Sequence, residues 1–473
     1  MIHNETSLAR GRWQAGALML CWALAACSGL LDVKNPNNVN ASDLDNPAAA
    51  PSIANGALSA VAYAWGAMLT EYATVSDELT WIGSRDGFRE LDVGNLTNQT
   101  NEFTDAAFPY VGRARWMADL AIQKLSGFDS AGTLKNRDDL ARSYLYAAII
   151  YVTIGDQFNN FPIGSDRRTA APPLGRDKMD SVYKVAIAYT TSGIAIAQAT
   201  KNKSLELALT AMRARARHAN AVWTLLHPVG TGVPHGSPLV NDAGANADAV
   251  AALALAAGTT DWKFRFSYSA TTVDNYIGGW VNSRQEMRVG DAYINKATND
   301  TLRDPILTLL RAQGDATIKP VDPEFRRATI EFTGTSATQF YAPLTVLSTR
   351  ELYLLLAEAA LATGDTLTNA GQFAASINAV RLLNYPDSAR YKYDPGNPAH
   401  PRPLAMLEYE RKVNLFMQGH RVHDLYRFGE RADVWQASTP VAEAVSTPGT
   451  FFPITQVELL SNPYCVKSPV ACQ

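Results

Sequence analysis

The stretch LFMQGHRVHDLYRFG (residues 415–429) places two histidines, two arginines and one aspartate in a run that otherwise has the pattern of a buried helix. His420 and His423 are three residues apart, near the spacing of two metal ligands on one helix, but no Glu or Asp is obviously supplied to complete a ligand shell. A buried charge is tolerated when it is paired, and this run contains both signs. We therefore favour a structural role over a metal or catalytic one. The side chains expected to make buried hydrogen bonds and ion pairs are His420, Arg421, Asp424 and Arg427.

The composition around this stretch is that of a folded chain with a large core. The sequence has 473 residues, of which 47% are hydrophobic and 18% charged, with a formal net charge of -3. This length predicts one to three domains. Nucleic-acid binding requires clustered Lys and Arg, and the sequence has no long basic cluster. A nucleic-acid partner is therefore excluded from the expected functions.

The N-terminus has the pattern of an export signal. Arg10 and Arg12 precede a short apolar run, residues 15–24, which is too short to span a bilayer. The run ends in Leu24-Ala25-Ala26-Cys27, which resembles a bacterial lipobox. We predict that residues 1–26 are a lipoprotein signal peptide and that Cys27 is lipidated, anchoring the chain to a membrane by acyl chains alone. The alternative is an ordinary signal peptide in which Cys27 is incidental.

Cysteine usage agrees with export. After removal of Cys21 and acylation of Cys27, only Cys465 and Cys472 remain. Outside the cytoplasm such a pair forms a disulfide readily, and a metal site would need two further ligands. We expect a terminal disulfide, no bound metal and no cofactor.

The mature chain is predicted to be mostly α-helical. Residues 27–50 indicate an extended tether, and residues 51–473 a single α domain. Alanine recurs on the helix-packing faces, which favours tetratricopeptide-like helix pairs forming a right-handed scaffold. Ser348 and Glu351 form a capping-box pattern, and Gly364 is positioned to end the helix that they begin. The helices expected to pair lie near residues 139–158, 179–199, 205–226, 350–363 and 369–383.

A long insertion interrupts this pattern. Between about residues 229 and 345 Gly, Asn, Thr and aromatic residues rise and helical periodicity weakens. The segment WKFRFSYS (262–269) alternates like a short strand. Loops of this length are usually functional or disordered. We therefore expect ligand contacts in this insertion and in the loop near residues 75–100.

Several stretches, in order along the chain, resemble the SusD/RagB family of bacterial outer-membrane lipoproteins. Their combination with a lipobox is specific, although each is weak alone. They are GDQFNNFPIG (155–164), PLGRDKMDSVYKVAIAY (173–189), YAPLTVLSTRELYLLLAEAALATGD (341–365), INAVR (377–381), LEYERKVNLFMQGHRVHDLYRFG (407–429) and FFPITQVELLSNP (451–463).

The resemblance implies a surface-exposed outer-membrane lipoprotein without catalytic activity. Such a protein binds a nutrient, usually an oligosaccharide, and delivers it to a SusC-like TonB-dependent transporter. Two alternatives come from other classes: a surface carbohydrate-active hydrolase, and a helical-repeat scaffold that binds only protein. The sequence has no HExxH, P-loop or nucleophile-elbow motif, so we expect no catalytic residue.

Capture of a sugar requires aromatic faces with a few polar groups beside them. Two stretches provide this combination, SDELTWIGSRDGFRE (76–90) and YIGGW (276–280). The ligand-binding candidates are Trp81, Arg85, Phe88, Asp77, Tyr276 and Trp280, with Asp86, Trp65 and Trp262 as weaker ones. For each of them the alternative is a place in the core of a helical protein.

Overall fold

The computed structural model describes residues 41–165, 169–227, 236–257, 261–295, 300–333, 340–365, 371–385, 389–432 and 447–472. The predicted signal peptide, Cys27 and most of the tether lie outside these ranges. The chain divides into two units, residues 1–49 and 50–473. In the first unit, the described part of the tether forms two short 3-10 helices, η2 (Ala41–Asp45) and η3 (Pro47–Ala49).

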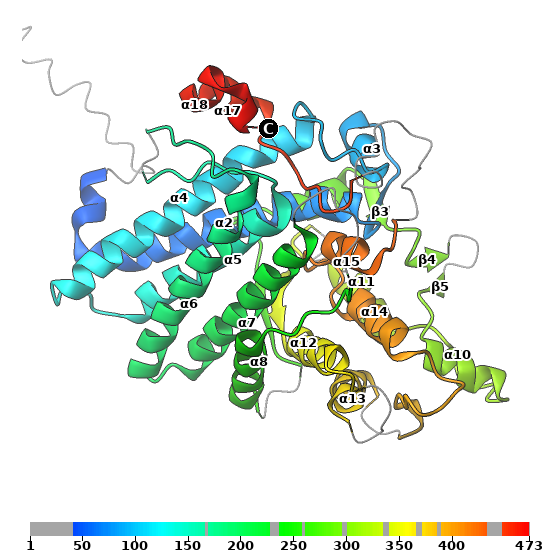
Figure 1. The fold of residues 1–473 in the computed structure, drawn as a ribbon. Coiled ribbons are helices and arrows are strands. Elements are labelled where there is room, and N and C mark those ends of the chain that lie inside the picture. The colour runs from blue at the N-terminus through cyan, green and yellow to red at the C-terminus, as the bar shows by residue number, and fades with distance from the viewer. Residues whose placement is uncertain are drawn as a thin grey trace, which may run out of the picture. The chain divides into compact units, whose positions relative to one another are not determined.

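The second unit is built from helices that pack each against the next, in the order α2, α4, α5, α6, α7, α8, α12 and α13. Figure 1 shows α5 to α8 as a stack of neighbouring helices. The bounds are α2 (Ala50–Val75), α4 (Glu102–Ser130), α5 (Asp138–Gln157), α6 (Asp180–Ala199), α7 (Lys203–Leu226), α8 (Ala243–Leu255), α12 (Thr349–Ala362) and α13 (Gln372–Asn384). All five predicted helices are confirmed to within three residues at each end.

Small residues allow these helices to approach closely, as the alanine pattern predicted. At Gly193 in α6 an added Cβ would lie 2.7 Å from a methyl carbon of Leu209 in α7. At Gly155 in α5 it would lie 2.5 Å from the ring of Tyr183 in α6. Larger side chains at either position would push the helices apart, because a packed interior has no space to absorb them.

The start and end of α12 are also as predicted. Ser348 Oγ accepts a hydrogen bond from the backbone N–H of Glu351 at 3.2 Å, which satisfies one of the free donors at the helix start. Gly364 follows the last turn with φ +87°, a conformation that glycine adopts without strain. The Glu351 carboxylate lies 3.2 Å from His420 Nε2.

The described strands form three two-stranded antiparallel sheets. They are β1 (Leu79–Trp81) with β3 (Met287–Val289), β2 (Lys263–Phe266) with β6 (Leu344–Ser348), and β4 (Ile294–Asn295) with β5 (Asp300–Thr301). The strand predicted within residues 262–269 is β2. Its partner β6 runs directly into α12, and the sequence did not predict it.

The insertion near residues 229–345 contains more helix than its weak periodicity indicated. Besides α8 it holds α10 (Pro305–Ala312) and α11 (Pro323–Thr333). Asp304 caps α10 by accepting hydrogen bonds from the N–H groups of Ile306 and Leu307 at 2.8 and 3.2 Å. The helices α10 and α11 are short, so their few turns gave too little periodic signal.

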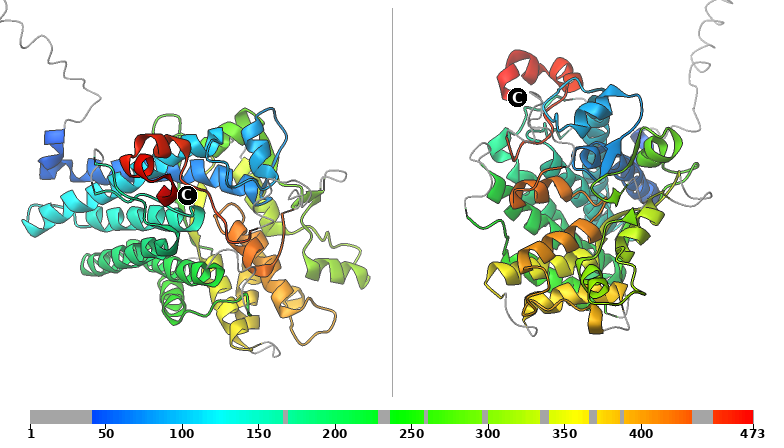
Figure 2. Two further views of the ribbon diagram at one scale, coloured as in Figure 1. Left: turned by 45° about the horizontal axis from the view of Figure 1, so that its top comes forward. Right: turned by 90° about the vertical axis from the view of Figure 1, so that its right-hand side faces the viewer.

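The remaining elements are short. They are α3 (Asp86–Asp92), η4 (Arg176–Lys178), α9 (Tyr276–Gly278), the π-helical turn η5 (Gly279–Ser283), η6 (Ala389–Tyr391), α14 (Pro403–Asn414), α15 (Arg421–Phe428), α17 (Gln456–Ser461), α18 (Pro463–Lys467) and η7 (Pro469–Cys472). Figure 2 shows α17, in red, near α4, in cyan, and the N–H of Val457 donates to Asp105 at 2.8 Å. The predicted disulfide between Cys465 and Cys472 is confirmed, with a Cα–Cα distance of 5.5 Å.

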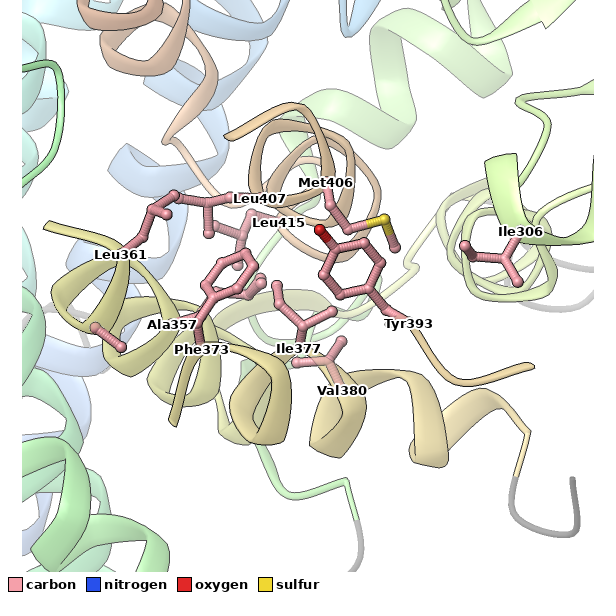
Figure 3. Close-up of a cluster of buried hydrophobic side chains, with 12 residues drawn as sticks. Ile306, Ala357, Leu361, Phe373, Ile377, Val380, Tyr393, Met406, Leu407 and Leu415 are labelled. Atoms are coloured by element: carbon pink, nitrogen blue, oxygen red, sulfur yellow. The ribbon is translucent and has the colours of Figure 1, made fainter. Parts of the chain in front are cut away.

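A hydrophobic cluster joins α12, α13, α14 and α10 at one end of the stack. Figure 3 shows Phe373 and Ile377 of α13 facing Leu407 and Met406 of α14, with the ring of Tyr393 beside them. All five are at most 1% exposed. Burying side chains of this size contributes roughly 1.5–3 kcal/mol each to folding. Among the described helices, none is long and apolar enough to cross a bilayer.

A buried carboxylate explains the charged run at residues 415–429. Glu358 of α12 has no exposed surface. It forms an ion pair with both terminal nitrogens of Arg427 in α15, and lies 3.5 Å from Arg411 in α14 and 3.1 Å from His218 in α7. The backbone N–H of Val240 also donates to it at 2.8 Å. One side chain therefore joins three helices and a loop to α12.

Asp424 closes this network, which we name the Glu358 cluster: Glu358, Arg411, Arg427, Asp424 and His218. Asp424 accepts from Arg411 at 2.9 and 3.0 Å and pairs with Arg427 at 2.9 Å. Burial alone would raise the pKa of Glu358, but Arg427, His218 and Arg411 outweigh it and hold that pKa well below its usual value. The prediction of paired, structural charges is confirmed.

The two histidines of the run contact different parts of the structure. His423 Nδ1 lies 3.0 Å from the Tyr72 hydroxyl, and His420 faces Glu351, so the two side chains meet different partners. Within the described ranges, no group of three or more His, Cys, Asp or Glu side chains is placed to hold a metal ion.

Replacing Glu358 by Gln tests the stabilising role of the cluster. The change leaves Arg427 and Arg411 buried with one carboxylate fewer, and we expect a loss of about 3–5 kcal/mol in unfolding free energy at pH 7. Because the folded-state pKa of Glu358 is depressed, the ion pairs stabilise the protein above pH of about 4.5 and their contribution falls as the pH drops below it. Urea unfolding at several pH values measures both effects.

The matched control is Asp129→Asn, which breaks the more exposed pair between Asp129 and Arg137. An exposed pair contributes about 0–1 kcal/mol. Equal losses for the two variants would contradict the central role of Glu358.

Candidate ligand-binding site

The structure brings together the two stretches in which ligand contacts were predicted. Strand β1 follows α2, and β3 follows the YIGGW segment. They pair with Leu79 opposite Val289 and Trp81 opposite Met287. The N–H of Gly290 also donates to the carbonyl of Glu78 at 2.9 Å. Segments some 200 residues apart therefore form one surface.

Glu286 fastens these two segments to each other. Its carboxylate accepts hydrogen bonds from the N–H groups of Ser84 and Arg85 at 2.8 and 2.9 Å, and from the Ser84 hydroxyl at 3.1 Å. Burial raises the pKa of Glu286, but these backbone hydrogen bonds outweigh it and lower the pKa. The close contact needs a glycine at position 83, because a Cβ there would lie 2.7 Å from the Glu286 Cα. Sequence reasoning missed Glu286, which carries no motif.

A line of half-buried aromatic rings runs across four elements beside this junction. We call it the aromatic row: Tyr110 of α4, Tyr63 of α2, Tyr276 of α9 and Trp280 of η5. Successive ring centroids are 5.0, 6.0 and 6.2 Å apart. Each ring is partly exposed. Tyr276 and Trp280 were predicted as candidates, whereas Tyr63 and Tyr110 were missed.

Phe88 and Asp77 were predicted to contact the ligand, but both are buried, so the structure corrects this prediction. Both side chains support the site from the interior of the protein. Phe88 is fully buried and stacks on Phe103 with 3.5 Å between ring centroids. Both rings meet the Trp280 ring edge-on, at 5.2 and 5.1 Å. Asp77 is 2% exposed, has φ +67°, and pairs with Arg421 at 3.3 Å. Neither side chain has surface to offer a ligand.

The Trp280 end of the row carries positive charge. The Arg284 guanidinium carbon lies 4.5 Å from the centre of the Trp280 ring, and that of Arg85 lies 6.0 Å away. Both arginines are exposed. Arg85 makes a long ion pair of 3.9 Å with Glu102. Arg85 was predicted as a candidate; Arg284 was not.

The other candidates lie outside the row. Trp81 is half-buried in β1, and its indole N–H is buried without a hydrogen-bond partner among the described residues. Asp86 is exposed and pairs with Arg89 at 3.0 Å. Trp65 is only 3% exposed beneath Arg215 and is a core residue. Trp262 is half-buried, and its carbonyl accepts the N–H of Thr349.

The hydroxyls of Tyr63 and Tyr276 stay protonated at neutral pH. Burial, with the neighbouring Tyr110, raises the pKa of Tyr63 to about 12. Burial raises the pKa of Tyr276. These groups can therefore donate as well as accept hydrogen bonds, as binding of sugar hydroxyls requires.

Glu71 of α2 is a fully buried acid that lies close to Tyr276. Neither of its carboxylate oxygens has a hydrogen-bond partner in the described part of the chain. Burial therefore raises the pKa of Glu71 well above its usual value, so the side chain is a neutral acid in the folded protein.

Apart from the aromatic row, a hollow of about 460 Å³ lies against α4 and α17. Gly112, Trp116, Phe161 and Val457 are among its lining residues. On α4, Gly112 and Trp116 are four residues apart and share one face of the helix. Tyr110 points to a different side. The hollow therefore opens on a different side of α4 from Tyr110, but it adjoins the aromatic row, because Arg113 lines it and is close enough to lower the pKa of Tyr63.

Comparison with known proteins finds a family match over part of the chain. Residues 331–465 match the sequence profile of the SusD family. This range includes α12, α14 and α15, which carry every member of the Glu358 cluster except His218. No curated protein matches the sequence.

Solved structures show that the fold extends over nearly the whole chain. A SusD homologue from Bacteroides thetaiotaomicron is 14% identical, covering 91% of this chain and 98% of its own, with a TM-score of 0.62. SusD superfamily proteins from Bacteroides vulgatus (12% identical, 88% and 97% covered) and Bacteroides fragilis (13% identical, 89% and 98% covered) each have a TM-score of 0.55. The protein has the SusD fold, and the resemblance to the SusD/RagB family is confirmed.

Glu71→Gln tests the buried neutral acid. In the unfolded chain Glu71 ionises above pH of about 4.5, so folding at higher pH requires proton uptake that costs about 1.4 kcal/mol per pH unit until the folded pKa is reached. Gln does not ionise. We expect the unfolding free energy of the variant to increase relative to that of the native protein as the pH rises from 5 to 8. A pH-independent difference in urea unfolding would show that Glu71 is charged in the fold.

Proposed function

We propose that this protein captures an oligosaccharide nutrient at the outer surface of a bacterial outer membrane and passes it, unchanged, to a SusC-like TonB-dependent transporter. The observation that carries the proposal is the aromatic row. Four partly exposed aromatic residues follow one another with 5.0–6.2 Å between neighbouring ring centroids and interplanar angles of 84°, 90° and 57°. Their faces and edges together offer an apolar surface to the C–H groups of successive sugar units.

The polar groups around the row suit the same ligand. The Tyr63 and Tyr276 hydroxyls are neutral donors and acceptors, and the arginines at the Trp280 end present further N–H donors. Apolar faces with a few placed polar groups are the usual composition of a small-ligand site. The SusD fold supports a binding role rather than a reaction.

The row is tested with Tyr276→Ala and Trp280→Phe, each titrated by calorimetry against hits from a glycan array. Loss of a stacking ring should weaken binding about tenfold for Tyr276→Ala and less for Trp280→Phe, since stacking contributes roughly 0.5–1.5 kcal/mol beyond area burial. Circular dichroism checks that both variants remain folded.

Two controls separate the row from other surfaces. Tyr464→Ala removes an aromatic ring that is 47% exposed in α18. Gly112→Trp fills the 460 Å³ hollow, because nothing lies within 4 Å of a Cβ at Gly112. Binding lost in Gly112→Trp but kept in the row variants would move the site to the hollow. Release of new reducing ends from a polysaccharide would replace the binding role by hydrolysis.

The anchor is tested separately with Cys27→Ser. The lipobox sequence supports acylation of Cys27, and two or more acyl chains hold a protein stably to a membrane. We expect the variant to appear in the soluble fraction, whereas the native protein sediments with outer membranes and is degraded by protease added to intact cells. A Cys27→Ser protein that still sediments with membranes contradicts the anchor.

A further inference from the structure

The guanidinium group of Arg284 is held over the Trp280 ring without an acidic partner. Its carbon lies 4.5 Å from the ring centre, and the side chain is exposed. Within the described part of the chain it forms no ion pair. The contact with the ring attracts the cation and restricts its motion. The result is a positive group kept in place at the end of the aromatic row, with its N–H donors available.

Arg85 adds a second cation to the same ring from the other segment. Its guanidinium carbon is 6.0 Å from the Trp280 centroid, and Glu286 fixes its backbone. Its ion pair with Glu102 is long, 3.9 Å, and both side chains are almost half exposed. A pair of this kind is weak and easily exchanged. A negatively charged ligand can therefore compete with Glu102 for Arg85.

This arrangement differs from that of the arginines that pair closely with carboxylates. Arg213, Arg350 and Arg427 each contact a carboxylate at 3.0 Å or less. Because the chain has a net charge of -3, the two exposed guanidinium groups at Trp280 do not result from a general excess of positive charge. Asp274 is exposed, and its negative charge raises the pKa of Tyr63. This negative charge therefore lies near Tyr63 and not at the Trp280 end of the row.

The chemistry that fits two such groups is an oxyanion attached to a sugar. A guanidinium presents parallel N–H donors that match carboxylate and sulfate oxygens, and such charge-assisted bonds are about twice as strong as neutral ones. A sugar ring bearing the anion can reach Arg284 while the adjoining units lie along Tyr276 and Tyr63. Neutral sugars leave the cations unpaired.

We propose that the site selects acidic oligosaccharides, whose uronate carboxylate or sulfate ester binds at Arg284 and Arg85. This inference rests on the proposed function, because it specifies the ligand class of the same aromatic row. It also assigns a role to Arg284, which neither its sequence context nor the fold indicates.

The test compares matched ligands that differ only in charge. A glycan array containing acidic and neutral backbones first identifies hits. Calorimetry then compares galacturonate oligomers with their methyl esters, and sulfated with desulfated carrageenan tetrasaccharides, whose desulfated backbone is neutral. We expect the hits to be acidic and the charged member of the bound pair to bind at least about tenfold more tightly in 50 mM salt. The preference should decrease in 500 mM salt because the cations are exposed. The pair that responds tells carboxylate from sulfate.

Variants connect the preference to the two arginines. Arg284→Ala should reduce the ratio of charged to neutral affinity to about one, and Arg284→Lys should restore it only in part, since an ammonium lacks the planar pair of donors. Arg85→Ala should reduce the ratio less. The matched control is Arg402→Ala, an exposed arginine at the start of α14, which should leave the ratio unchanged.

Failure of the inference and failure of the proposed function give different results. Hits that are all neutral, or a charged-to-neutral ratio that Arg284→Ala does not change, overturn the acidic-ligand inference and leave the binding role intact. An array on which no glycan binds overturns both.

Discussion

The rest of the structure depends on the pairing of one buried carboxylate, that of Glu358. A lone charge in the interior would be strongly unfavourable, so its partners must come to it. Arg427, Arg411 and His218 meet it from α15, α14 and α7. Helix α7 is far in sequence from α12, α14 and α15, and the packing of these helices is fixed where the charges meet. The charged run that resembled a metal or catalytic site is therefore the junction of the helical scaffold.

The same helix α15 connects the scaffold to the candidate site. At its start, Arg421 pairs with Asp77, which has a left-handed backbone conformation just before β1. The carboxylate of Glu78, the residue after Asp77, accepts a hydrogen bond from the N–H of Met417 at 2.6 Å. Strand β1 then pairs with β3 and places Arg85 near Trp280. Buried structural charges and exposed binding charges thus lie along one connected path, with different partners at its two ends.

In the proposed site, aromatic and charged side chains lie together on a packed base. Phe88 and Phe103 support Trp280 from inside, and the ring in turn holds Arg284. Rings that are already packed lose little conformational entropy when a ligand binds, which favours affinity. A surface that stacks sugar rings and also presents cations can discriminate between glycans of similar shape.

The sequence by itself determined the features that depend on neighbouring residues. Helix periodicity, the Ser348 cap, the Gly364 end of α12 and the short loop between Cys465 and Cys472 are local, and the structure confirms each of them. Tertiary packing decided which side chains remain at the surface. Phe88 and Trp280 are both aromatic residues in irregular segments, yet one is buried and the other partly exposed. Tyr63 and Tyr110 follow helical spacing like core residues, and only the packing of α2 on α4 beside α9 leaves their rings in a row. Periodicity defines the faces of a helix, but exposure depends on which other segments cover each face.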